Sequence, residues 1–162
     1  MSSDAKIKEI LNNQEKHVRR VGTNADWAAG GNFDIFTITG APVRVTALFG
    51  HVITAFTGAV PTPLLSFTPT GGGALTNIST IAVAAAWAIN TLLMWNGLLA
   101  TALVASIGIG HGATGVETFA GFLTFVPGVI RITNGGVLDG TGMVDWYISY
   151  VVCDPTSLIV AA

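Results

Sequence analysis

The chain has 162 residues, a formal net charge of −2 and one cysteine. This length leaves room for one domain with a core of its own, and Cys153 alone excludes a disulfide framework within the chain. Only 10% of the residues are charged, against about 25% in an ordinary soluble domain. So few charges would solvate a monomer poorly, which indicates either a membrane protein or a subunit that hides much of its surface in an assembly.

The basic residues are concentrated at the N-terminus. The first 20 residues hold five basic and three acidic side chains, whereas the rest of the chain holds two basic and six acidic ones. The first ten residues, MSSDAKIKEI, contain no apolar stretch of the kind that forms a secretory signal, so synthesis in the cytoplasm is expected.

Residues 3–20 are predicted to form one amphipathic helix. Four apolar residues share one face of this helix: Ile7, Ile10, Leu11 and Val18. A helix this short gains stability mainly by packing on something else, so we expect an arm that binds a partner. The residues expected to make this contact are Ile7, Ile10, Leu11, Lys16, Val18, Arg19 and Arg20. The alternative is a frayed terminal tail, since termini are commonly disordered.

A glycine-rich linker follows the predicted helix. Residues 21–32, VGTNADWAAGGN, are small and polar, and Trp27 is the side chain expected to anchor them. The chain is therefore predicted to divide into an arm and linker over residues 1–26 and a β-sandwich domain over residues 27–162.

The stretch from Phe33 to Phe56 is predicted to form a pair of strands joined by a turn. Apolar residues lie on both faces of this pair, and the alternation ends at Gly50. Gly40 and Pro42 break the run, because glycine adopts φ > 0 readily and proline lacks the N–H that a strand ladder needs. A strand pair that is apolar on both faces must lie inside a sandwich, a barrel or a subunit interface.

A charge-free stretch occupies the middle of the chain. Leu64–Thr68 is predicted as a short strand, and the following PTGGG as an exposed loop. Residues 78–109 contain no charge and are long enough to span a bilayer, so a membrane helix is one alternative. Asn90-Thr91 and Asn96-Gly97 interrupt this run, and Asn-Gly between apolar segments is typical of a hairpin. We therefore predict strands near residues 80–87, 91–95 and 98–105.

The C-terminal part carries the clearest strand pattern. Phe119–Phe125, Val129–Thr133 and Met143–Val152 are predicted strands. The last of them places Trp146, Ile148, Tyr150 and Val152 on one face and Asp145, Tyr147, Ser149 and Val151 on the other. Short strands with closely spaced turn signals predict an all-β fold, an antiparallel β-sandwich or jelly-roll-like domain with a short N-terminal helical arm.

No pattern in the sequence carries a specific chemistry. Residues 107–115, IGIGHGATG, superficially fit the dinucleotide fingerprint, but no acidic residue stands about 20 residues further on. His51, His111 and Cys153 lack the spacing of metal ligands, and no nucleophile elbow is present. Five of the seven basic residues lie in the N-terminal segment, which disfavours nucleic-acid binding by the domain. We therefore predict that the protein is not an enzyme and has no cofactor, metal, nucleic acid or small-molecule substrate.

Several segments of the sequence resemble small virion proteins of tailed bacteriophages. They are FTITGAPVRVTALFGHVITAF, a middle section that ends in ALVAS, GVIRI, and MVDWYISYVVCDPTSLIVAA. In that family a hairpin opens the domain, and a strand with alternating Trp and Tyr, an Asp-containing turn and an apolar Ala-rich tail close it. The resemblance covers roughly residues 33–162 as a pattern. Asp154-Pro155 matches the family's proline only loosely, and the charge-free middle section departs from the family.

Such virion proteins are similar to capsid decoration (cement) proteins, which form trimers of β-sandwich or jelly-roll subunits on the shell. The resemblance therefore implies a non-enzymatic virion structural protein. It would be a homotrimer that binds the major capsid protein on the outside of a phage shell and stabilises it. The charge-free middle section keeps a tail or adaptor role open.

Seven aromatic residues are expected in the core or at an oligomer interface: Phe36, Phe49, Trp87, Trp95, Trp146, Tyr147 and Tyr150. A second hypothesis is a receptor- or sugar-binding module in which four of the aromatic residues form an exposed platform: Trp87, Trp95, Trp146 and Tyr147. A third hypothesis is a small phage membrane protein that uses Ile78–Ile109 as its span.

Overall fold

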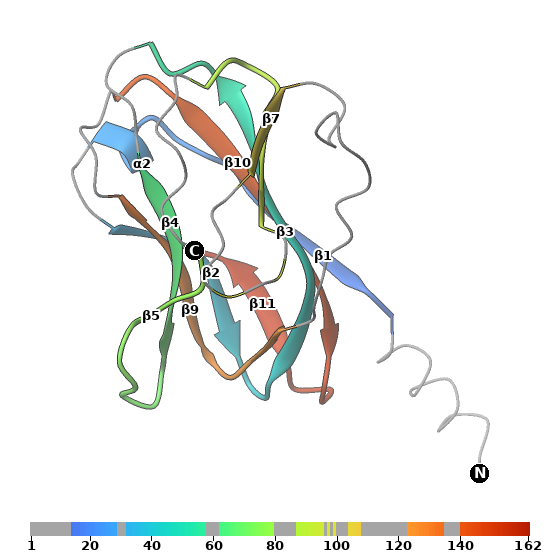
Figure 1. Cartoon of the computed structure of the whole chain (residues 1–162). Helices are drawn as coiled ribbons and strands as arrows, with labels where there is room; N and C mark the ends of the chain where they lie inside the picture. The colour runs from blue at the N-terminus through green and yellow to red at the C-terminus, as the bar shows by residue number, and fades with distance from the viewer. Residues whose placement is uncertain are drawn as a thin grey trace.

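Two antiparallel sheets pack face to face in the computed structural model (Figure 1). The structure describes residues 14–28, 32–57, 62–79, 87–95, 97, 99, 104–107, 123–134 and 140–162. Its one described helix is α2 (Ala25–Ala28), so the predicted all-β sandwich is confirmed.

The strands of the first sheet, here called sheet A, come from both ends and the middle of the chain. In order across the sheet they are β1 (Lys16–Arg20), β10 (Met143–Val152), β3 (Val43–Thr54), β6 (Thr91–Trp95) and β7 (Val104–Ile107). A further strand, β8 (Leu123–Phe125), pairs with the beginning of β3. β6 and β10 have the bounds that the sequence predicted for residues 91–95 and Met143–Val152.

The second sheet, sheet B, begins with the C-terminal strand. Its order is β11 (Leu158–Ala161), β2 (Asn32–Thr39), β9 (Gly128–Asn134), β4 (Pro63–Pro69) and β5 (Thr76–Asn77). The predicted strands at Leu64–Thr68 and Val129–Thr133 are confirmed as β4 and β9.

The expected pairing of the two strands in Phe33–Phe56 is wrong. β2 lies in sheet B between β11 and β9, and β3 lies in sheet A beside β10 and β6. The turn between them crosses from one sheet to the other. Gly40 has a φ of 78°, and a Cβ there would lie 1.9 Å from the Thr156 carbonyl oxygen, so the turn packs directly on the connection between β10 and β11. Each strand therefore buries one apolar face between the sheets and finds other partners at its edges.

The predicted helix over residues 3–20 is wrong for its last five residues. Residues 16–20 form β1, which pairs in antiparallel register with β10 from Lys16 opposite Tyr150 to Arg20 opposite Trp146. Exposure alternates along β1, and Val18 packs against the core. The free edge of β10 offers this segment a ladder of hydrogen bonds that outweighs its helix propensity. Ile7, Ile10 and Leu11 lie outside the described residues.

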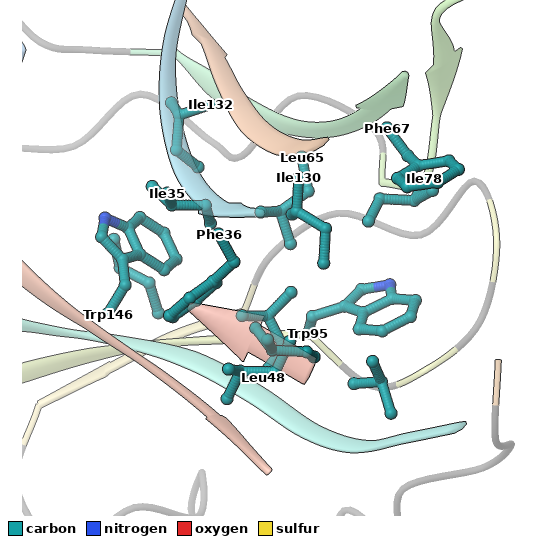
Figure 2. Packing of buried hydrophobic residues seen from close by; sticks show 14 of the residues in the cluster. Ile35, Phe36, Leu48, Leu65, Phe67, Ile78, Trp95, Ile130, Ile132 and Trp146 are labelled. Carbon is teal, nitrogen blue, oxygen red and sulfur yellow. The ribbon is translucent and has the colours of Figure 1, made fainter. Parts of the chain in front are cut away.

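The core fills the space between the two sheets (Figure 2). Trp146, Trp95 and Leu48 enter it from sheet A, and Phe36 and Ile130 enter it from sheet B. As the alternation of β10 predicted, its side chains at positions 146, 148, 150 and 152 all point inward and are buried. Period-2 burial therefore fixes which face of β10 points to solvent.

The small helix α2 closes one end of the sandwich with an aromatic cluster (Figure 1). Trp27 is fully buried and contacts the rings of Phe33, Phe56 and Trp87 edge-on, with centroid distances of 5.1, 5.1 and 6.3 Å. The expected anchor of residues 21–32 is thus confirmed.

The charge-free stretch contains strands. β6 and β7 both lie within residues 78–109, and no helix among the described residues is long and apolar enough to cross a membrane. The predicted strand near 80–87 falls almost wholly outside the described residues, as do most of residues 98–105, residues 119–122 and the glycine-rich residues 108–115 with His111.

Candidate functional site

The structure separates the seven singled-out aromatic residues into two groups. Five lie in the core with at most 2% of their surface exposed: Phe36, Trp87, Trp95, Trp146 and Tyr150. Phe49 and Tyr147 instead lie on the solvent face of sheet A and are half-buried. The three tryptophans are buried, so the predicted exposed platform of Trp87, Trp95, Trp146 and Tyr147 is wrong.

Phe49 and Tyr147 belong to a row of side chains that crosses the outer face of sheet A. The register places Arg19 opposite Tyr147, Tyr147 opposite Phe49, and Phe49 opposite Met94. We call these four residues, one each from β1, β10, β3 and β6, the aromatic row. The rings of Phe49 and Tyr147 are stacked, with centroids 5.0 Å apart and an interplanar angle of 11°. Cross-strand contacts of this kind hold the two rings in fixed positions.

A hollow of about 460 Å³ lies beside the stacked rings. Its lining comes from three adjacent strands and consists of His17, Val18, Arg19, Phe49, Tyr147, Ile148 and Ser149. His17 Nδ1 and Ser149 Oγ are 2.8 Å apart at its polar rim. A rigid aromatic wall with a polar rim is suited to bind apolar side chains from another segment.

Arg19 is held over Tyr147 by a buried carboxylate. Its Nε and Nη2 donate to Oδ2 of Asp145 at 3.0 and 2.5 Å, and its guanidinium carbon lies 5.8 Å from the Tyr147 ring centroid. The Asp145 side chain is 1% exposed, whereas that of Arg19 is 55% exposed. The hydrogen bond and the charge of Asp145 raise the pKa of Arg19 further above its usual value. The positive charge of Arg19 is therefore largely neutralised within the sheet.

The second oxygen of Asp145 fixes the chain that leaves β1. The Gly22 N–H donates to Asp145 Oδ1 at 2.9 Å. A Cβ on Gly22 would lie 2.2 Å from the Val144 carbonyl oxygen, so only glycine permits this approach.

Arg20 ties three parts of the chain together. Its Nη1 and Nη2 donate to the two oxygens of Asp26 at 2.7 and 2.8 Å, and its Nε donates to the Ala162 carbonyl oxygen at 3.0 Å. Both side chains of the ion pair are mostly buried. Burial alone would raise the pKa of Asp26, but hydrogen bonds from Arg20 and Thr23 outweigh it, so this pKa lies below its usual value. Arg20 therefore anchors β1 to α2 and β11.

The residues expected to form a docking arm thus have different roles. Arg19 lies on the outer face, Val18 packs against the core, and Arg20 is an internal anchor. Their partners, Asp145 and Asp26, were not predicted from the sequence. For Asp145 the available signal was its place as the one acidic residue within the otherwise largely apolar strand β10, since such a charge needs a partner when it is buried.

Three ion pairs neutralise six charged side chains among the described residues. Besides the pairs of Arg19 and Arg20, Arg131 Nη2 lies 2.9 Å from Asp34 Oδ1 on the outer face of sheet B. Among the residues that the structure describes, no group of three His, Cys, Asp or Glu side chains could hold a metal ion.

The outer face of sheet A thus combines a stacked aromatic pair, an adjacent hollow and a strand anchored by two ion pairs. No protein-family model, no curated protein and no solved structure matches the chain.

Proposed function

We propose that the protein is a non-enzymatic virion structural protein, a capsid decoration subunit that binds the outside of a phage shell through its N-terminal arm. The observation that carries this proposal is the anchoring of β1. A segment that holds a subunit on a shell must transmit load to the folded domain. β1 is joined to β10 along its length, to Asp145 through Arg19, and to α2 and β11 through Arg20.

The charge distribution supports an assembly role. Six charged side chains cancel in pairs within the subunit, which leaves the described part of the surface with little charge to keep single copies apart. We propose that copies of the chain associate, as a homotrimer, and that the major capsid protein is the second partner. A decoration subunit adds buried contact area across junctions of the shell, so internal pressure must break more contacts before the shell opens.

The resemblance to phage virion proteins supports the same function. The segments that carry it include β2 and β3 with the turn between them, β10, and the Asp154-Pro155 turn that leads into β11. β2 and β3 depart from the family's pattern, because they lie in different sheets and do not form its opening hairpin. These segments contribute strands to both sheets and residues to the aromatic row, so the resemblance covers strands that build the core of the domain.

A cryo-electron microscopy reconstruction of the virion that carries this chain tests the location. We expect density for the sandwich on the outer surface of the shell, at positions related by three-fold symmetry. Density at the tail tip would replace the proposal with an adaptor or receptor-binding role, and density within a membrane would replace it with a membrane role.

Particles made without this chain provide the matched control. They should assemble but release their genome at a lower temperature, and purified protein added back should restore the wild-type release temperature. If added protein binds at full occupancy without changing that temperature, the chain is a surface protein with no cement function.

A further inference from the structure

The Glu15 side chain, directly before β1, reaches over the outer face of sheet A. The Glu15 carboxylate accepts a hydrogen bond from the hydroxyl of Thr46, which belongs to β3. β10 lies between β1 and β3 in this sheet. The Glu15 side chain therefore crosses β10 toward the strand that carries Phe49. Only Gln14 and Glu15 separate β1 from residues 1–13, and residues 1–13 lie outside the described residues.

The sequence of this N-terminal segment matches what the hollow can bind. Ile7, Ile10 and Leu11 have the i, i+3, i+4 spacing of anchors that enter an apolar groove from one face of a helix. A helix over residues 3–13 would be about 16 Å long. The aromatic row crosses four strands, which at a strand spacing of about 4.8 Å span about 14 Å. The segment therefore has the length of the row.

We propose that residues 1–13 dock as an amphipathic helix on the aromatic row of their own chain, with Ile7, Ile10 and Leu11 in the hollow beside Phe49 and Tyr147. The two-residue connection keeps the segment near its own hollow at an effective concentration of about millimolar, which favours this site over that of another copy. A docked helix covers the apolar rings and gives this face a polar outer surface.

The docked position also determines where the basic residues of the arm point. On a helix, Lys6 and Lys8 flank the stripe of Ile7, Ile10 and Leu11 on either side. They would remain at the water-facing edges and be presented to an acidic partner surface, where they add orientation and association rate. This role of the lysines rests on the proposed function, whereas the contact between the arm and the row does not.

Nuclear magnetic resonance on the full chain tests the contact. The Ile and Leu methyl groups would be labelled with ¹³C, with protonated Phe and Tyr rings in a deuterated background. We expect nuclear Overhauser effects from the Ile7, Ile10 and Leu11 methyls to the rings of Phe49 and Tyr147, and upfield ring-current shifts of these methyls. Methyl signals at random-coil positions without such effects would overturn the proposal, even if the protein decorates capsids.

Two variants of the full chain provide a matched comparison. Tyr147→Ser removes one wall of the hollow, whereas Leu64→Ser removes a half-buried side chain of similar exposure from the outer face of sheet B. We expect Tyr147→Ser to abolish the arm-to-ring effects and to raise tryptic cleavage after Lys6 and Lys8 by roughly tenfold, because a docked segment must open before it is cut. Equal cleavage in both variants and the wild type would overturn the proposal.

A mixed sample identifies which copy supplies the arm. Half of the protein molecules carry labelled methyls and the other half carry protonated rings, so methyl-to-ring nuclear Overhauser effects can arise only between copies. We expect none. Methyl-to-ring effects in this sample would assign the row to the arm of a second copy and overturn docking within one chain. The triple variant Ile7→Ser, Ile10→Ser, Leu11→Ser gives an independent readout: its Phe49 and Tyr147 ring signals should shift, and unchanged ring signals would contradict the proposal.

Discussion

Asp145 holds the end of β1 and the residues after it on sheet A. It is fully buried on the outer face of sheet A and accepts hydrogen bonds from Arg19 and from the Gly22 N–H. Asp145→Ala leaves both donors without an acceptor and should lower the free energy of unfolding by about 3 kcal/mol. Asp145→Asn keeps an acceptor for Gly22 and should cost less. Chemical denaturation of the purified variants measures both changes.

The control for Asp145 is an ion pair that lies in solvent. The Asp34 side chain is 43% exposed and pairs with Arg131. Asp34→Ala should therefore cost at most about 1 kcal/mol, because exposed pairs contribute little. An equal loss in Asp34→Ala and Asp145→Ala would show that burial of the Asp145 carboxylate does not decide its contribution.

Asp26 makes the stability of the fold depend on pH in the acid range. Its pKa in the folded protein lies below the ordinary value of 3.8, with hydrogen bonds from Arg20 and Thr23 outweighing the opposing effect of burial. A lowered folded pKa means that the stabilisation is present above pH 3.8 and is lost as the pH falls through the folded pKa. The melting temperature of the wild type should therefore exceed that of Asp26→Asn at pH 7, and the difference should shrink below about pH 4.

A double variant shows whether Arg20 is the source of this pH dependence. In Arg20→Gln the effect of Asp26→Asn on the melting temperature should be smaller at pH 7 than it is in the wild type, because the main partner of the carboxylate is gone. If the Asp26→Asn effect is the same in both backgrounds, Thr23 and other groups stabilise the carboxylate without Arg20.

Residue-level inference from the sequence succeeded where alternation alone decides the outcome. The period of two placed Trp146 and Tyr150 on one face of β10 and Tyr147 on the other, and the structure confirms this division. The contact of Arg19 with Asp145 could not be predicted, because it depends on β1 pairing with β10 across 126 positions of sequence. No local pattern reports such a distant pairing.

At the scale of elements, β1 shows how tertiary contacts override a local pattern. The segment KHVRR has one apolar residue and contains good helix formers, so propensity favoured a continuation of the predicted helix. The strand forms because β10 offers an unpaired edge and because Arg19 and Arg20 reach carboxylates there and in α2. The turn after β2 illustrates the same limit, since Gly40 and Pro42 signal a reversal equally well for a hairpin and for a crossing between sheets.

The four-residue helix α2 is predicted to hold one end of the sandwich closed. Trp27→Ala removes the centre of the cluster formed with Phe33, Phe56 and Trp87, and should lower the free energy of unfolding by about 4 kcal/mol through lost burial and the cavity left behind. Thermal unfolding followed by near-ultraviolet circular dichroism measures this loss.

Two substitutions separate the packing of Trp27 from other effects. The Trp27 indole N–H has no hydrogen-bond partner among the described residues, so Trp27→Phe loses no such bond. Its loss in free energy of unfolding should therefore be less than half of the loss in Trp27→Ala. Ile89, which is 56% exposed, is the control, and Ile89→Ala should change stability by less than about 0.5 kcal/mol. A loss in Trp27→Phe as large as in Trp27→Ala would contradict a packing role.

At the scale of the whole molecule, the low charge predicts self-association. We expect light scattering at micromolar concentration to give the mass of a homotrimer, with little effect of salt, because three described ion pairs already cancel within one chain. The fold class followed from the sequence because strand length and alternation are local, whereas oligomeric state depends on surfaces that no local pattern defines. A monomer at this concentration would leave the low charge unexplained and contradict the assembly proposal.

The anchoring of β1 changes where the arm can be removed without unfolding the domain. A deletion of residues 1–20 would take away the edge strand of sheet A and leave Asp145 and Asp26 without their arginine partners. Unpairing buried carboxylates is costly, so this deletion should lower the free energy of unfolding by at least about 4 kcal/mol and the melting temperature by roughly 10 °C.

A deletion of residues 1–13 keeps β1 and both ion pairs, and the melting temperature of this shorter deletion should fall by less than a third of that amount. Calorimetry on the two truncated proteins distinguishes an arm that ends before β1, with β1 as part of the folded domain, from an arm that includes β1. Equal melting temperatures would mean that β1 contributes nothing to the stability of the sandwich, and the segment that anchors the subunit on the capsid would then have to lie elsewhere in the chain.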